Sequence, residues 1–164
     1  MLEARERYGG FAQDAAAREQ LRLPFERRQK SRQRATLASG EEIAIDLPRG
    51  QVLRDGDLLM ASDRRVIQVV AEPERVVQVE ARDAHDLARA AYHLGNRHVA
   101  VQVGPDWLRI AADPVIERML VGLGMRLASL EAAFEPEPGA YAPHHRHDNE
   151  SGHGGRIHEF GSKP

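Results

Sequence analysis

The chain has 164 residues, of which 41% are hydrophobic and 29% charged, with a net charge of −2 and no cysteine. A chain of this length and composition can bury a hydrophobic core in one domain or two small ones. The lack of cysteine excludes disulfides, thiolate metal sites and thiol nucleophiles. The near-neutral charge gives no general attraction to nucleic acid or anionic membranes. Because no apolar run could span a bilayer and the first ten residues lack the apolar core of a signal peptide, we expect a cytoplasmic protein that binds neither nucleic acid nor membranes.

Residues 1–72 are expected to form an N-terminal β domain. Residues 1–20 mix charges with glycine and show no sustained apolar stripe, so we expect a mobile or loosely docked start. From Leu21 to Glu72, short apolar runs alternate with turn signals, which is typical of antiparallel strands. Residues 21–34 are predominantly basic, which indicates either a solvated strand face or a docking surface for a partner protein.

Residues 73–134 have a different pattern and are predicted to form a second domain. Pro73 separates two valine-rich segments and marks the boundary. The predicted order is strand, helix, strand, strand, helix, strand, over residues 75–81, 83–95, 98–103, 107–111, 113–124 and 125–134. This order is that of a ferredoxin-like domain, in which both helices cover one face of a four-stranded sheet and leave the other face open. The predicted fold class is therefore α+β.

Both predicted helices carry signals at their ends. Asp83 and Asp113 are suited to cap the two N-termini, because a carboxylate accepts hydrogen bonds from the first free N–H groups. Pro114 falls at the first helical position, where its missing N–H costs nothing. Gly95 is expected to end the first helix in the left-handed conformation.

His98 is the first candidate metal ligand. It opens the predicted strand 98–103, in which three valines share one face. If these valines face the helices, His98 points to the open face, where burial requires another domain or a second copy of the chain. Two copies of His98 would supply two imidazole ligands, and a complete metal site would need further ligands from elsewhere. A single histidine near a helix end is also a common cap or surface group, and His93 has the same ordinary explanation near the negative end of the helix dipole.

The histidine-rich end of the chain, residues 135–164, is the second candidate. It contains too little apolar surface to fold alone, so we expect a flexible, disordered tail. Neutral imidazole suits nickel, zinc and copper, and it binds metal less well once it is protonated below neutral pH. A merely polar tail or an expression tag is the alternative. The candidate ligands here are His144, His145, His147, His153 and His158.

Several separated motifs together resemble one known family. They are the sequence LPFERRQKSRQRATLASGEEIAIDLPRG at 23–50, VLRDGD at 52–57, AYHLGNRH at 91–98 and the histidine-rich end. In this order they are similar to the UreE urease accessory proteins, which are nickel metallochaperones. The resemblance covers nearly the whole chain from Leu21 onward. One departure is Ala100, because many members carry proline two residues after the histidine of the GNRH motif.

The resemblance implies a homodimer that carries Ni(II) without catalysing a reaction. By the match to the GNRH motif, His98 would bind nickel at the dimer interface, and the tail histidines would supply further or auxiliary ligands. The metal would pass through an accessory complex containing a GTPase to urease apoprotein. Zn(II) and Cu(II) would compete, because ligand type alone does not select nickel.

Other functions fit the sequence less well. A histidine-rich store or buffer for nickel or zinc is the principal alternative, and a peptide-binding module with incidental metal affinity is the next. A hydrolytic metalloenzyme would show a motif such as H-E-x-x-H, which the sequence lacks. An RNA-binding domain of the same element order would show aromatic residues on its central strands, and here they carry only Trp107.

Overall fold

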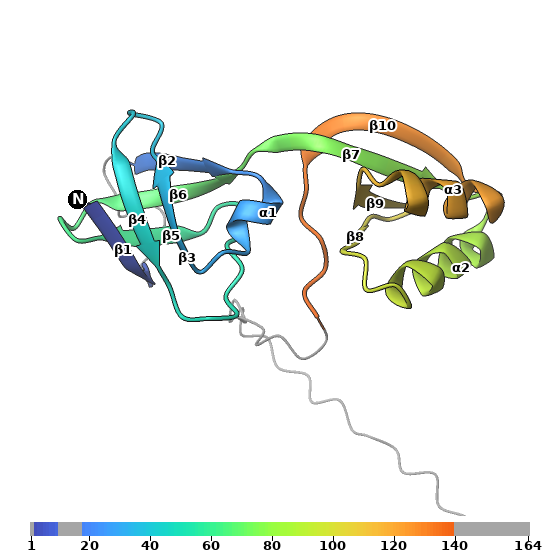
Figure 1. Cartoon of the computed structure of the whole chain (residues 1–164), viewed down its shortest axis with the longest axis horizontal. Coiled ribbons are helices and arrows are strands. Elements are labelled where there is room, and N and C mark those ends of the chain that lie inside the picture. Colours follow the sequence, from blue (N-terminus) through green and yellow to red (C-terminus); the bar gives the residue numbers. More distant parts are fainter. Residues whose placement is uncertain (1, 10–17, 140–164) are drawn as a thin grey trace, which may run out of the picture.

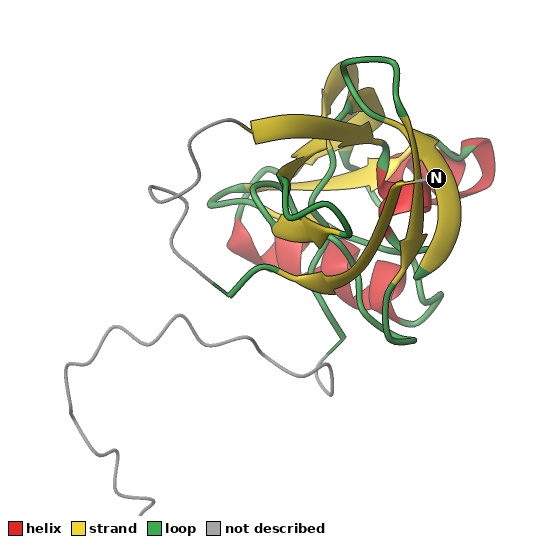
Figure 2. Cartoon of the chain, turned by 90° about the vertical axis from the view of Figure 1, so that its left-hand side faces the viewer, coloured by secondary structure: helices red, strands yellow, loops and turns green. Residues whose placement is uncertain are grey.

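The computed structural model describes residues 2–9 and 18–139, and in them strands greatly outnumber helices (Figure 2). Two β-sheets stand side by side, with a short helix between them (Figure 1). The strands are β1 (Leu2–Arg7), β2 (Arg18–Leu23), β3 (Arg32–Thr36), β4 (Glu42–Asp46), β5 (Leu58–Ala61), β6 (Val66–Ala71), β7 (Pro73–Glu80), β8 (Gln102–Val103), β9 (Trp107–Ala111) and β10 (Arg126–Ala133). The helices are α1 (Phe25–Arg28), α2 (Ala84–Gly95) and α3 (Pro114–Gly122). The fold is α+β, as the sequence predicts.

The first sheet has six strands in the order β2-β6-β5-β1-β4-β3. The predicted antiparallel arrangement is wrong at two places, because β1 pairs in parallel with β4 and β2 pairs in parallel with β6. Parallel neighbours must be distant in sequence, since a tight hairpin joins only antiparallel strands. The turn signals between 21 and 72 therefore predict the hairpins but not these two long-range pairs.

The prediction of a loosely docked start is wrong for residues 2–7. β1 lies inside the first sheet, between β4 and β5, with Leu2 and Ala4 buried in its core. Only two inward positions of this short strand are apolar, so the alternation is too brief to stand out among the charges of LEARER. The other members of this core are Leu21, Leu23, Ala35, Leu37, Ile43, Ile45, Leu47, Leu53, Leu59, Ala61, Ile67 and Val69.

The second sheet has four antiparallel strands in the order β10-β7-β9-β8. Along the chain its elements follow the predicted order of strand, helix, strand, strand, helix, strand. Both helices pack against the same core, because their buried side chains and those of the strands form one cluster. Its buried members are Val77, Val79, Ala90, Leu94, Leu108, Ile110, Ile116, Leu120 and Met125.

The two predicted helix caps are confirmed. The side chain of Asp83 accepts a hydrogen bond from the N–H of Asp86, and that of Asp113 accepts from the N–H groups of Val115 and Ile116. Pro114 occupies the first helical position of α3, as predicted. These bonds satisfy N–H groups that have no partner inside the helix.

A small third core joins the two sheets. Phe25 of α1, Val76 of β7 and Phe134 after β10 are buried together, and the two phenyl rings meet edge to face with centroids 5.3 Å apart. Arg28 lies beside them and is completely buried. Neither interpretation of the basic stretch 21–34 fits this residue, although Arg32 is exposed and pairs with Asp46 as a solvated arginine would.

Candidate metal centre

His98 lies in the turn that ends α2. The helix continues through Gly95, and His98 then takes a positive φ of 54°. Its N–H donates to the carbonyl of Gly95 at 3.0 Å, and the N–H of Val99 donates to that of Leu94 at 3.2 Å. The second bond spans five residues, as in a helix end closed by a left-handed residue. The predicted left-handed role of Gly95 is therefore wrong, and His98, a residue type that tolerates this conformation better than most, takes it instead.

The predicted strand 98–103 is also mostly wrong. Only Gln102 and Val103 pair as β8, and residues 98–101 form the connection from the helix to this short strand. Val99 and Val101 still pack on the core of the second sheet, whereas Val103 is 53% exposed. Val99 and Val101 therefore alternate with exposed positions because this extended segment lies on the core, although it does not pair as a strand.

The imidazole of His98 is available to bind a ligand. His98 is exposed, and within residues 2–9 and 18–139 its side chain enters no hydrogen bond or ion pair. The backbone bonds of the turn fix where its Cα lies, and β8, the strand that follows, is an edge strand of the second sheet. A second copy of the chain can therefore approach His98 without displacing a partner seen in this part of the structure.

The other two described histidines are placed differently. His93 of α2 is half-buried, and its ring meets Tyr92 edge to face with centroids 5.4 Å apart. It lies in the last turn of the helix, where an imidazole interacts favourably with the helix dipole. His85 is exposed in the first turn, with Nδ1 3.9 Å from Oδ1 of Asp86. The structure therefore does not bring the three histidines together.

Asp83, His85 and Asp86 present a second group of possible ligand atoms, within 4.8 Å of one another. Sequence patterns indicate Asp83 only as a helix cap and do not point to this group. Asp86 is almost fully buried and accepts hydrogen bonds from Arg82 at 2.7 and 2.9 Å and from Arg89 at 2.9 Å. The bond from Arg82 is the main reason that the pKa of Asp86 lies below its usual value. A cation here would have to displace two guanidinium groups, so the cluster is better described as an ion-pair network at the helix start.

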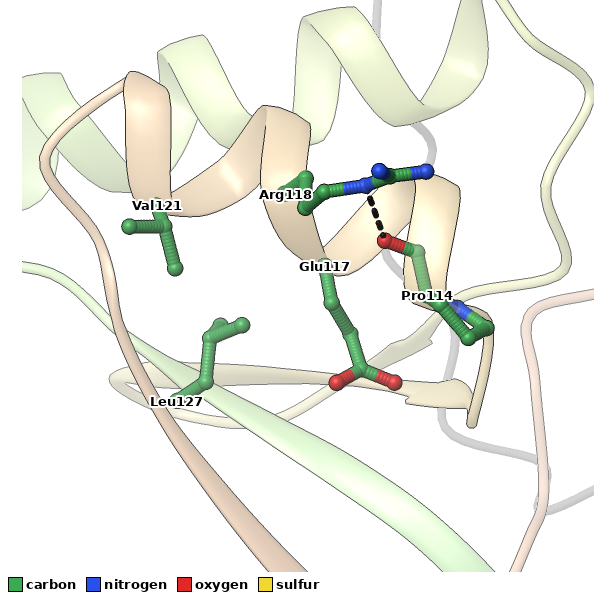
Figure 3. A pocket seen from close by; sticks show the side chains of 5 residues that line it. All are labelled: Pro114, Glu117, Arg118, Val121 and Leu127. Carbon is green, nitrogen blue, oxygen red and sulfur yellow. Dashed lines mark hydrogen bonds between the residues drawn. The ribbon is translucent and has the colours of Figure 1, made fainter.

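The hollow between α3 and β10 carries no imidazole on its lining. It measures about 550 Å³ and is lined by Pro114, Glu117, Arg118, Val121 and Leu127. Figure 3 shows the Glu117 carboxylate pointing away from Arg118, which donates to the carbonyl of Pro114 at 3.2 Å. One carboxylate is too few ligands for a metal ion.

The tail histidines at 144, 145, 147, 153 and 158 lie outside the described residues, so their metal binding stays a prediction. The segment that leads to them is described as far as Gly139. It lies beside the segment that follows His98, because the N–H of Glu137 donates to the carbonyl of Val101 at 2.8 Å. The described segment that precedes the tail therefore passes beside the chain between His98 and β8.

Comparison with known proteins gives one consistent family. Residues 2–72 match the family model described as the N-terminal domain of UreE urease accessory protein, and residues 74–161 match that of its C-terminal domain. No helix in the described part of the chain is long and apolar enough to cross a membrane.

Curated relatives of the chain bear the name urease accessory protein UreE, and three of them illustrate the match. The protein of Cupriavidus pinatubonensis is 53% identical over 131 residues, which cover 80% of this chain and 59% of that protein. The relative from Nitrosospira multiformis is 51% identical over 82% of this chain and 78% of its own length. The relative from Pseudomonas fluorescens strain Pf-5 is 48% identical over 88% of this chain and 90% of its own length. The match therefore spans about three fifths of the first protein and most of the other two.

Proposed function

Since this chain belongs to the UreE urease accessory protein family, which has a role in urease maturation, we propose that it is a nickel metallochaperone. It binds Ni(II) and delivers it to urease apoprotein while the urease active site is assembled. The observation that carries this proposal is the exposed imidazole of His98, held by a hydrogen-bonded turn and free of protein partners among the described residues. It acts as a carrier and not as an enzyme.

The proposed architecture has three parts. Residues 1–72 form the N-terminal β domain, 73–134 form a ferredoxin-like metal-binding domain, and 135–164 form a flexible tail. The strand order β10-β7-β9-β8 with both helices packed on one core supports the second assignment. The protein is a homodimer in which the two His98 turns meet, because one imidazole alone is a weak metal site and a twofold axis doubles it.

The proposed nickel site is labile. Two His98 imidazoles leave coordination positions open, and tail histidines occupy them reversibly. Lability suits a carrier, since the cargo must leave for urease apoprotein through the accessory GTPase complex in the cytoplasm. Zn(II) and Cu(II) compete for the same ligands, so selectivity for nickel depends on geometry, supply and partners.

A nickel or zinc buffer is the second candidate function. It is favoured by the number of histidines beyond residue 143, which is five of the eight in the chain. In that case the tail would hold the metal and His98 would be dispensable.

Calorimetric titration with Ni(II) separates these two functions. We compare the full chain, the His98→Asn variant and a chain truncated after Pro143, with the dimer mass measured by light scattering. Asparagine is preferred to alanine here because it tolerates the left-handed conformation of residue 98 and so keeps the turn. His98→Asn is expected to remove the tightest binding step, and truncation mainly the weaker ones. Loss of all binding on truncation would contradict the carrier proposal and favour the buffer.

A further inference from the structure

β10 forms one border of the second sheet, and Figure 1 shows β7 on its inner side only. All eight residues of β10 pair with β7 in an unbroken antiparallel register, from Arg126 opposite Glu80 to Ala133 opposite Pro73. In an antiparallel ladder every second residue turns its N–H and C=O away from the partner strand. Among the described residues, the backbone of 126–133 makes no backbone hydrogen bond outside this pairing. β10 therefore presents a row of free donors and acceptors along its outer side.

The other sheet borders in the described part of the chain are shorter or partly covered. β8, at the opposite border of the second sheet, has two residues. In the first sheet, the carbonyls of Gln20 on β2 and Arg34 on β3 already accept hydrogen bonds from residues outside the strands. Natural proteins usually protect an exposed edge strand with a proline, a bulge, charged side chains or a covering segment. β10 has no proline and no bulge, and Arg126 and Glu131 are its only charged residues.

The hollow between α3 and β10 continues this edge on the helix side of the sheet. Leu127 and Ser129 face that side, because they lie opposite Val79 and Val77, which belong to the core under the helices. The hollow measures about 550 Å³ and is lined by Leu127, by the exposed Val121 and by three other residues of α3 (Figure 3). A strand added beside β10 would lie about 4.8 Å from it, so a side chain opposite Leu127 would enter the hollow.

The carboxylates beside this hollow have no cationic partner in the described structure. Glu117 lines the hollow and accepts a hydrogen bond from the N–H of Asp113 at 3.1 Å, but it enters no ion pair among the described residues. Glu131 is exposed, lies on the same side of β10 as Leu127, and likewise has no ion pair within residues 2–9 and 18–139. Arg118 donates to a backbone carbonyl of its own helix instead. An incoming basic side chain would therefore be attracted by two carboxylates.

We propose that β10 is a docking site for an extended segment of a partner protein, which adds a strand to the second sheet. The segment carries an apolar side chain opposite Leu127 and basic side chains two and four residues away on the same side, beside Glu117 and Glu131. Backbone hydrogen bonds hold such a segment, and the side chains select it. A second copy of the chain fits less well, because pairing β10 with itself gathers the carboxylates of both copies without a cation.

The docking site is separate from the proposed nickel site. β10 and β8 are the two opposite borders of the second sheet, and the His98 turn precedes β8. A dimer contact at the His98 turn therefore leaves β10 free, and docking at β10 does not depend on metal. The proposal thus goes beyond nickel binding and can fail without affecting it.

A peptide with this chemistry tests the site on the full chain. The probe is TKTKTLTKTKT, which reads the same in both directions and so fits a parallel or an antiparallel strand. Amide hydrogen exchange of residues 126–133 is followed by NMR with and without the probe. A docked strand is expected to protect every second amide of β10. Absence of this protection at millimolar probe would overturn the proposal.

Substitution of exposed valines tests the hollow by calorimetric titration with the same probe. Val121→Arg is expected to weaken binding about tenfold, because the new side chain keeps the leucine of the probe from apolar contact. Val115→Arg is the matched control, since Val115 is an exposed valine of the same helix that does not line the hollow. Its effect is expected to stay below about twofold, because an exposed charge away from the site is screened. Equal losses in the two variants would overturn the role of the hollow.

The charge requirement is tested with Glu131→Gln, which is expected to weaken binding of the probe about threefold. Glu42→Gln is the control, because Glu42 is an exposed glutamate of β4 with no ion pair among the described residues. Equal binding of the acidic peptide TETETLTETET would overturn the assignment of a basic segment. Protection of β10 amides that rises with protein concentration, without any peptide, would overturn it in favour of a second copy of the chain.

Discussion

Replacing His98 by asparagine is expected to lower urease activation at limiting nickel by at least about tenfold, because loss of a partner that only orients a metal ligand already costs 10- to 100-fold in affinity. His98 is the proposed ligand because its imidazole is exposed and its turn is held by backbone hydrogen bonds. Asparagine keeps the left-handed turn and removes the ring nitrogen. The measurement is urease activity in cells that express a urease with its accessory proteins and this chain or its variant.

His93→Asn is the matched control for this experiment. His93 also belongs to the last part of α2, but its ring packs against Tyr92. We expect activation close to that of the wild type, and we expect excess nickel to restore activation in the His98 variant. Equal activation by the wild type and His98→Asn at limiting nickel would contradict the role of His98.

Replacing Arg28 by methionine is expected to reduce the free energy of unfolding by about 3 kcal/mol, the lower end of the usual cost of breaking a buried ion pair, because the partner carboxylate left behind, that of Glu135, is partly exposed. Methionine fills similar space but leaves the carbonyls of Leu53 and Phe134 without this donor, whereas that of Leu23 still accepts from the N–H of Glu72 at 3.1 Å. A buried carbonyl oxygen without a donor has hydrogen bonds neither to water nor to protein, and this lowers the stability of the folded state. Urea denaturation followed by circular dichroism measures the loss.

Arg32→Met provides the comparison. Arg32 is exposed and pairs with the exposed Asp46 at 2.6 Å, so its replacement is expected to change the free energy of unfolding by less than about 1 kcal/mol. If both variants lost the same stability, the buried network of Arg28 would not be a main contact between the two sheets.

Local signals predicted the second sheet better than the first. Asp83, Asp113 and Pro114 mark helix starts through bonds made within three residues, so the sequence alone indicates them. The strands predicted over 107–111 and 125–134 are present as β9 and β10, because the apolar positions that indicate them lie close together in sequence. In the first sheet, the parallel partner of β1 lies about 40 residues away, and no local pattern indicates it.

The role of His98 as a metal ligand stays a prediction, and its predicted position on a strand is wrong. His98 was expected on a strand face, whereas the structure places it in the left-handed turn after α2. His98 rather than Gly95 adopts the left-handed conformation because the helix continues past Gly95, and where the helix ends depends on its packing against the core. Ala100 is the position where the resemblance implied proline, and in the described structure its N–H makes no hydrogen bond. Proline at this position would therefore remove no such bond.

The buried position of Arg28 could not be predicted at all. Its charge resembles that of the neighbouring exposed arginines, and its carboxylate partner, Glu135, is 107 residues away. Arginine is rarely buried unless it is paired, so the expectation of a solvated face was the reasonable one. The role of the five histidines beyond residue 143 stays a prediction.

Direct transfer of nickel is the measurement that tests the central claim. Wild-type protein and His98→Asn are loaded to the same nickel content and supplied as the only nickel source to urease apoprotein with its accessory proteins, while a chelator removes free metal. We predict that wild-type protein activates urease and that His98→Asn, which carries nickel only on its tail, does not. Equal activation by both would contradict delivery through His98 and would identify the protein as a histidine-tail buffer.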